Sequence, residues 1–137
     1  MADMALIVPS PMTKRVGRRK SDGELSEHTL DATGGRRFFV AEFDQGDVDS
    51  QAAKIWRLQK QYAPLVLVAH SGGKSLHSWF YCGDQPKGRV SKFMSRAFAL
   101  GADRATKTRS QFVRIPGGAR DGSIRQEIYF FNPKVLP

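Results

Sequence analysis

Apolar residues in this chain recur with two different periods, and the order of those periods limits what the chain can fold into. Alternating segments have the period of a half-buried strand, and segments with apolar residues three or four positions apart have that of an amphipathic helix. The predicted order is strand, helix, strand, strand, helix, strand, strand, at residues 36–44, 48–62, 65–70, 75–82, 90–98, 111–115 and 125–131. This order predicts an α+β domain.

The same order is that of a ferredoxin-like sheet, the βαββαβ arrangement shared with RNA-recognition modules, with an extra C-terminal strand. Both helices then cover one sheet face, and the first and third strands lie antiparallel at the centre. The strand at 111–115 is expected to border the first. Phe39, Ala41 and Phe43 should face the helices, which leaves the acidic residues of the first strand on an open face.

Composition bounds the class of protein. The chain has 137 residues, of which 40% are hydrophobic and 10% aromatic, enough for one domain and too apolar for a disordered chain. Its longest apolar run, residues 65–69, is far shorter than the roughly 18 residues of a membrane span. The first residues lack the basic and apolar regions of a secretory signal, so a cytoplasmic location is expected. The single cysteine, Cys82, excludes an internal disulfide and a cysteine zinc cluster.

Lys and Arg outnumber Asp and Glu by 22 to 13, which gives a formal net charge of +9. Such a surplus favours polyanionic partners, including nucleic acid and nucleotides. Five of the cations lie within residues 14–20, inside an irregular stretch, residues 1–35. We expect this stretch, called the leader below, to be flexible and to precede a folded module of residues 36–137. The basic run is either a solvated arm or an additional contact to a phosphate backbone.

Acidic residues and a histidine are expected to converge at one end of the predicted sheet. His77 on the third strand should approach Asp44 at the end of the first, with Glu42 two residues earlier and Asp103 reaching the same end. Crowded carboxylates raise one another's pKa unless a cation neutralises them, and hard oxygen ligands favour Mg²⁺ or Mn²⁺. Basic residues suited to phosphate oxygens are expected nearby: Lys74, Arg109 and Arg114. A metal beside a phosphate clamp indicates phosphoryl or nucleotidyl transfer.

Four runs carry these residues: EFD at 42–44, SGGKSLH at 71–77, GAD at 101–103 and TRSQFVRIPGG at 108–118. Together they resemble the three motifs of the archaeo-eukaryotic primase superfamily, the primase-polymerase enzymes. In that family the first motif is a pair of acids two apart, the second is serine, any residue, then histidine, and the third is an acid after small or apolar residues. The resemblance covers about residues 36–131 and implies a minimal primase-polymerase core.

The resemblance implies a role for each matching residue. Two metal ions, Mg²⁺ or Mn²⁺, would be held by Glu42, Asp44 and Asp103, which with His77 would form the catalytic set. The nucleoside triphosphate would be bound by Ser71, Lys74, Ser75, His77, Arg109 and Arg114. The implied function is a DNA primase or polymerase that adds nucleotides to a 3′-hydroxyl on single-stranded DNA or a primer-template, in replication or repair.

Two features depart from the family pattern. Glu42 stands where the family more often has Asp, so its longer side chain shifts a bound metal unless the backbone compensates. Family members also place an α/β subdomain before the first motif, whereas about 35 mostly irregular residues precede it here. A helicase or a further primase domain is therefore an expected partner.

Alternative interpretations stay open at the sequence level. Asp103 is either a metal ligand or a cap for the segment after it, and Trp79 either stacks on a base or fills the sheet face. A P-loop is excluded because Val68 stands five residues before Gly73, where that motif requires glycine. The rival function is a non-catalytic module that binds single-stranded nucleic acid in replication initiation.

Overall fold

The computed structural model describes residues 5–61, 63–120 and 122–137. Its longer elements are β4 (Phe38–Phe43), α1 (Val48–Gln59), β5 (Leu65–His70), β6 (Leu76–Tyr81), α2 (Lys87–Ala99) and β10 (Glu127–Phe131). The shorter ones are β1 (Leu6–Ile7), β2 (Gly17–Arg18), β3 (Leu25–Ser26), β7 (Val113–Arg114), β8 (Ala119–Arg120), β9 (Ile124–Arg125) and the 3-10 turns η1 (Arg104–Lys107) and η2 (Pro133–Val135). The predicted α+β class is confirmed.

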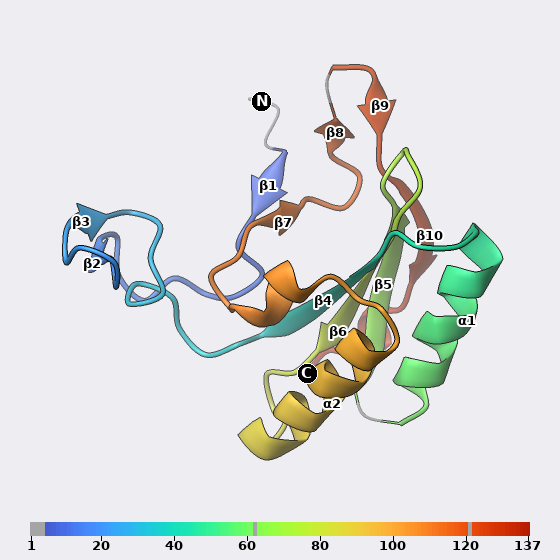
Figure 1. The fold of residues 1–137 in the computed structure, drawn as a ribbon, viewed down its shortest axis with the longest axis horizontal. Coiled ribbons are helices and arrows are strands. Elements are labelled where there is room, and N and C mark those ends of the chain that lie inside the picture. The colour runs from blue at the N-terminus through green and yellow to red at the C-terminus, as the bar shows by residue number, and fades with distance from the viewer. Residues whose placement is uncertain (1–4, 62, 121) are drawn as a thin grey trace.

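Four strands form the main sheet in the order β10–β5–β6–β4, and each neighbouring pair is antiparallel (Figure 1). β5 and β6 form the predicted hairpin around the SGGK turn. β4 lies beside β6, as expected for the first and third predicted strands. α1 connects β4 to β5, so these two parallel strands lie on either side of β6.

The main core lies between this sheet and the two helices (Figure 1). Phe39, Ala41 and Phe43 of β4 are fully buried in one cluster with Leu58 of α1 and Phe93 of α2. Burying a side chain such as Leu58 or Phe93 contributes roughly 1.5–3 kcal/mol. The helix-facing set predicted for the first strand is therefore confirmed.

α1 packs on the core through a face that matches its expected apolar stripe only in part, since Val48 and Ile55 contact the core cluster but Ala52 is exposed. Gln51, Ile55 and Leu58 are buried at helical spacing. Trp56, expected in the apolar stripe, is 58% exposed, because it follows Ile55 by about 100° around the helix axis. Tyr62, expected in the same stripe, lies outside the described residues.

The apolar stripe predicted for α2 is confirmed. Phe93 and Ala97 are buried, and Val90, Met94 and Phe98 pack against the same cluster. After the helix, Gly101 has a φ of 97°, a conformation that glycine adopts without steric cost. Within the described ranges, neither helix has the length and apolar character needed to cross a lipid bilayer.

The second sheet face is covered, which corrects the prediction of an open face. Val40, Trp79 and Tyr81 form a second buried cluster on it together with Val113. Residues 135–136 of the C-terminal segment pack against this cluster. Because β4 and β6 carry apolar side chains on both faces, the sheet needs cover on both sides.

The predicted strand at 111–115 does not border β4, which corrects a second expectation. Only β7 forms there, and it pairs with β1, while β10 pairs with β5 at the far sheet edge. Two other segments meet the outer edge of β4: Phe38 N donates to the Pro9 carbonyl oxygen at 3.2 Å, and Asp103 N donates to the Glu42 carbonyl oxygen at 2.9 Å. These contacts occupy backbone N–H and carbonyl groups of β4 that a neighbouring strand at this edge would need for its own hydrogen bonds. The ferredoxin-like arrangement is therefore not confirmed.

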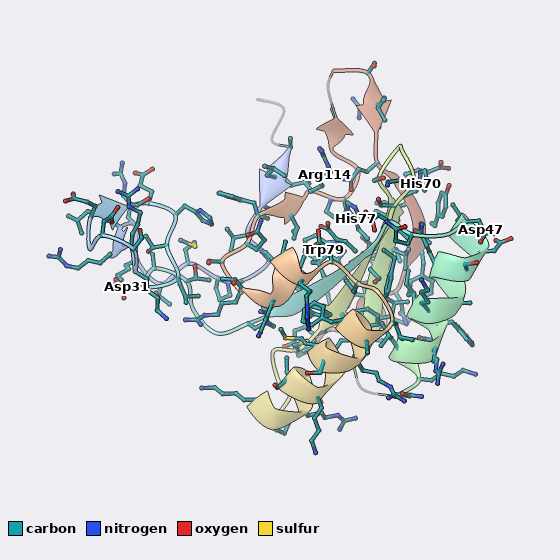
Figure 2. The ribbon with its side chains drawn as sticks, in the orientation of Figure 1. Asp31, Asp47, His70, His77, Trp79 and Arg114 are labelled. Carbon is teal, nitrogen blue, oxygen red and sulfur yellow. The ribbon has the colours of Figure 1, made fainter. Side chains whose placement is uncertain are left out.

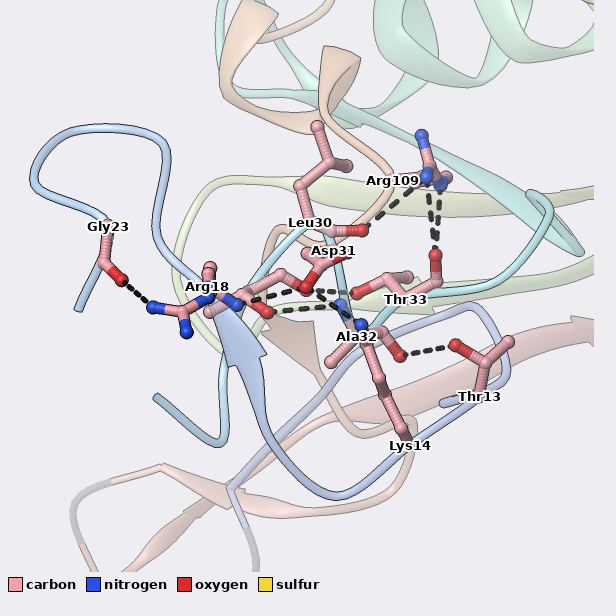
Figure 3. Close-up of polar contacts among 10 residues, drawn as sticks. Thr13, Lys14, Arg18, Gly23, Leu30, Asp31, Ala32, Thr33 and Arg109 are labelled. Atoms are coloured by element: carbon pink, nitrogen blue, oxygen red, sulfur yellow. Dashed lines mark hydrogen bonds and ion pairs between the residues drawn. The ribbon is translucent and has the colours of Figure 1, made fainter. Parts of the chain in front are cut away.

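The leader is mostly irregular, as predicted, but parts of it are attached to the rest of the chain. Thr29, Ala32 and Thr33 are buried. The Arg109 guanidinium donates hydrogen bonds to backbone carbonyl oxygens of this segment, at 3.4 Å to Leu30 and 3.2 Å to Thr33 (Figure 3). The sequence pattern missed this attachment because it depends on a residue about 75 positions away.

Acidic neighbours inside the leader neutralise much of its basic run. Three ion pairs form there, Lys14–Asp31 at 2.8 Å, Arg15–Glu27 at 3.1 Å and Arg19–Asp22 at 2.9 Å. Residues 14–31 contain five cations and four carboxylates in all. All these paired side chains are well exposed, so the pairs add little stability. They leave the leader little surplus charge for a polyanion, which favours a solvated surface over a phosphate contact.

Candidate functional site

The end of β4 and the start of β6 bring the first two motif runs together. Glu42 lies opposite His77 in the antiparallel register. Asp44 follows the strand, and its Oδ2 lies 4.0 Å from Lys74 Nζ. The sequence prediction put His77 beside Asp44, but the register pairs it with Glu42 because β4 ends at Phe43 and Asp44 lies beyond the ladder.

The SGGK turn is shaped by its own serine. Ser71 Oγ accepts hydrogen bonds from the backbone N–H of Gly73 at 3.3 Å and of Ser75 at 3.2 Å. Gly72 has a φ of 80°, and a Cβ there would lie 2.2 Å from Ile124 Cγ2, so this position requires glycine. The Ser71 hydroxyl thus holds the turn, while Ser75 is half-buried. Nucleotide binding by either serine stays a prediction.

Gln51 joins this turn to the loop after β4, and the sequence analysis did not single it out. Its fully buried side chain accepts a hydrogen bond from Leu76 N at 2.8 Å and donates to the carbonyl oxygens of Lys74 at 2.8 Å and Gly46 at 3.1 Å. These bonds satisfy the buried amide and fix the backbone of Lys74 relative to the end of β4. A glutamine in line with the apolar residues of α1 was the signal that could have identified it.

Glu42 is half-buried, and its pKa is raised. Burial is the main cause, the Asp103 carboxylate adds to it, the Arg114 guanidinium opposes it, and the Asp44 carboxylate raises the pKa further. The backbone hydrogen bond from Asp103 to Glu42 holds these two acids side by side on neighbouring segments. Three carboxylates and one arginine from separate parts of the chain therefore act on one another at this end of the sheet.

His77 is buried at the same place. Only 6% of it is exposed, and its Nδ1 has no hydrogen-bond partner among the described residues. Burial, the Arg114 guanidinium and His70 lower the pKa of His77 to about 4. Figure 2 shows Arg114, His70 and His77 gathered near the β5–β6 turn. The imidazole is therefore neutral at pH 7 and retains one N–H donor and one acceptor.

Two residues considered for nucleotide or base contact lie elsewhere. The Arg109 guanidinium binds carbonyl oxygens of the leader, and the structure does not bring it to the Glu42–His77 group. Trp79 is buried in the second sheet face, with its ring centroid 5.8 Å from that of Phe38 in an edge-on contact. Trp79 therefore fills the sheet face, the second of its two alternatives, and offers no exposed ring for stacking on a base.

A two-metal site held by Glu42, Asp44 and Asp103, which the resemblance implies, stays a prediction. Within the described ranges, no three His, Cys, Asp or Glu side chains are grouped to hold a metal. The Asp103 carboxylate caps η1 by accepting a hydrogen bond from Ala105 N at 2.9 Å, one of the two roles that the sequence left open. The donor set still fits Mg²⁺ or Mn²⁺, which use one or two carboxylates and fill their shells with water and substrate phosphate. Glu42 and Asp44 could supply those two.

No protein-family model, curated protein or solved structure matches this chain. The primase-polymerase resemblance therefore rests on the four sequence runs, and family membership stays a prediction. What the geometry adds is that residues from all four runs lie within electrostatic reach of Glu42 or His77.

Proposed function

We propose that this protein is a metal-dependent nucleotidyltransferase of primase-polymerase type. One observation carries the proposal: charged and polar residues from distant segments lie together at the C-terminal end of β4, namely Glu42, Asp44, Lys74, His77, Asp103 and Arg114. Like-charged carboxylates destabilise a fold when they are placed together beside a neutral histidine whose Nδ1 has no partner among the described residues, and such arrangements are typical of functional sites.

Five of these residues, all except Asp103, have a chemical task in the proposed reaction, the attack of a 3′-hydroxyl on the α-phosphate of a nucleoside triphosphate. A divalent ion, when bound, supplies charge neutralisation for the attacking and leaving oxygens. Glu42 and Asp44 would hold that ion through carboxylate oxygens. Lys74 and Arg114 attract the triphosphate oxygens. The neutral His77 donates a hydrogen bond to one of them.

Primer extension by the full chain tests the proposal. With a labelled deoxynucleotide, a primer-template and Mn²⁺, we expect Asp44→Ala to lower incorporation by at least roughly a hundredfold. The melting temperature should stay level or rise, because removing Asp44 relieves repulsion with Glu42. Asp84→Ala is the matched control, since Asp84 is an exposed acid in the loop before α2, and it should retain the activity of the parent.

Two outcomes would count against the proposal. Incorporation by Asp44→Ala at the parent's rate, with the same melting temperature, removes Asp44 from the site. A parent chain that incorporates no nucleotide but binds single-stranded DNA equally well with and without Mn²⁺ is instead the non-catalytic nucleic-acid-binding module.

A further inference from the structure

A basic pocket lies toward the other end of β4 from the Glu42–His77 group. Its volume is about 1010 Å³, and it is lined by the leader, the residues before β4, the start of α2 and the end of η1. Four cations line it: Arg36, Lys87, Lys107 and Arg109. β4 separates this pocket from the acids by roughly 20 Å, because its six residues rise about 3.3 Å each.

The cations of this pocket are not neutralised, unlike those of the leader. No Asp or Glu is among the described residues that line the pocket. None of the four cations forms an ion pair with a described carboxylate, whereas Lys14, Arg15 and Arg19 in the leader all do. An anion entering the pocket therefore meets uncompensated positive charge from several sides.

The two arginines are held in place by uncharged groups. Arg36 donates to the carbonyl oxygens of Thr106, at 3.4 Å, and Lys107, and it lies over the Phe39 ring. Arg109 donates to the carbonyl oxygens of Gly34 and its neighbours through Nε and Nη2, and its Nη1 donates to no described group. Carbonyl oxygens orient a guanidinium without cancelling its charge, so the positive field of this pocket is preorganised.

The start of α2 adds to the same field. Lys87, Val90 and Ser91 of its first turns line the pocket. Pro86 at the N-cap makes no side-chain capping bond, and the first turn has no acidic residue. The positive end of the helix dipole is therefore left without a negative group of its own.

We propose that this pocket is a metal-independent phosphate-binding site that takes the backbone of single-stranded nucleic acid. Four cations from three segments suit the several phosphates of a strand, and the volume is at the upper limit for one small ligand. This inference does not rest on nucleotidyl transfer, because the binding needs neither the acids nor a divalent ion.

Binding of a fluorescent oligothymidylate of about 16 nucleotides, measured by anisotropy in EDTA at several salt concentrations, tests the site. Lys87 and Lys107 are exposed, so the full-chain variant Lys87→Glu/Lys107→Glu should fold. We expect it to bind about tenfold more weakly at low salt, with a slope of log affinity against log salt reduced by roughly 1.4, or about 0.7 per lost phosphate contact. The control Lys92→Glu/Lys134→Glu has the same net charge, alters exposed residues outside the pocket and should show a smaller change.

Binding of inorganic pyrophosphate to the same variants tests whether the pocket holds a nucleic-acid strand or a free phosphorylated compound. If the pocket variant loses affinity for pyrophosphate and keeps its affinity for the oligonucleotide, a strand is not the occupant. Equal oligonucleotide affinity and salt slope in the pocket variant and its charge-matched control overturn the site itself. If the glutamate pair lowers the melting temperature, Lys87→Ala/Lys107→Ala applies the same test without adding negative charge. Because EDTA is present throughout, none of these results depends on the outcome of primer extension.

Discussion

Two buried polar side chains at the candidate site are in opposite situations. Gln51 satisfies both ends of its amide through bonds to three backbone groups. His77 Nδ1 is buried with no partner among the described residues. A buried polar atom without a partner costs roughly 1–3 kcal/mol, so packing alone does not favour histidine at this position. The proposed hydrogen bond between His77 and a triphosphate explains why a histidine stands at this position despite that cost.

His77 should also make stability depend on pH. Its pKa in the folded chain is about 4, below its usual 6.5, so the unfolded chain binds the proton first as pH falls. The stability lost between pH 6.5 and 4 should reach roughly 3 kcal/mol, and none of it should be lost above that window. We expect urea unfolding of His77→Gln at pH 7 and pH 5 to show a smaller decrease at pH 5 than the parent shows. An equal decrease in both proteins would contradict the prediction.

The raised pKa of Glu42 makes stability depend on pH in the direction opposite to that of His77. Its pKa in the folded chain is raised above the usual 4.5, so its contribution is present at low pH and is lost as pH rises through the folded-state pKa. Because parent and His77→Gln share Glu42, comparing the two proteins at each pH separates the histidine contribution from the carboxyl contribution.

At the scale of elements, α1 is positioned by its cap and by its buried face more than by its largest side chain. Asp47 accepts a hydrogen bond from Ser50 N at 2.7 Å at the helix start. The buried face then brings Gln51 to the SGGK turn and Leu58 to the core. The Trp56 ring remains outside, with Lys60 Nζ 5.0 Å from its centroid.

Truncating a buried and an exposed side chain of α1 should therefore lower the free energy of unfolding by different amounts. Leu58 is fully buried, so Leu58→Ala should lower the free energy of unfolding by about 2–5 kcal/mol. Trp56 is 58% exposed, so Trp56→Ala should change it by about 0.5 kcal/mol or less. Urea denaturation of the two variants provides the measurement. A loss for Trp56→Ala as large as that for Leu58→Ala would show that the helix packs through the stripe its apolar residues suggest.

Across the whole molecule, Arg109 attaches the leader to the segment that follows η1. Its guanidinium binds carbonyl oxygens of Leu30, Thr33 and Gly34, and charged hydrogen bonds of this kind contribute about 1.5–3 kcal/mol each. Arg109→Ala should let the leader open, so that trypsin cleaves within residues 14–20 at least about tenfold faster than in the parent. Arg125→Ala, an exposed arginine on β9, is the control. Equal cleavage rates in both variants would mean that the leader is held by other contacts.

Local spacing of residue types along the chain was enough to predict several features of the fold. Alternation placed Phe39 and Phe43 toward the helices, and helical spacing identified the buried stripe of α2, because side-chain direction follows directly from the period of a strand or helix. The SGGK turn between two strands was equally local, since it depends on glycine conformations within a few residues.

The local pattern did not predict the partners of β7 and β10, or which side chains meet across the fold. Residues more than 30 positions apart are joined in the pairing of β10 with β5, the pairing of His77 with Glu42, the packing of Val113 in the Trp79 cluster and the attachment of Arg109. Such pairings depend on competition for the same sheet edge and the same apolar surface, which no local period records. For that reason Asp103 could be placed near Glu42 from the sequence, while the hydrogen bond that turns its carboxylate to Ala105 N could not.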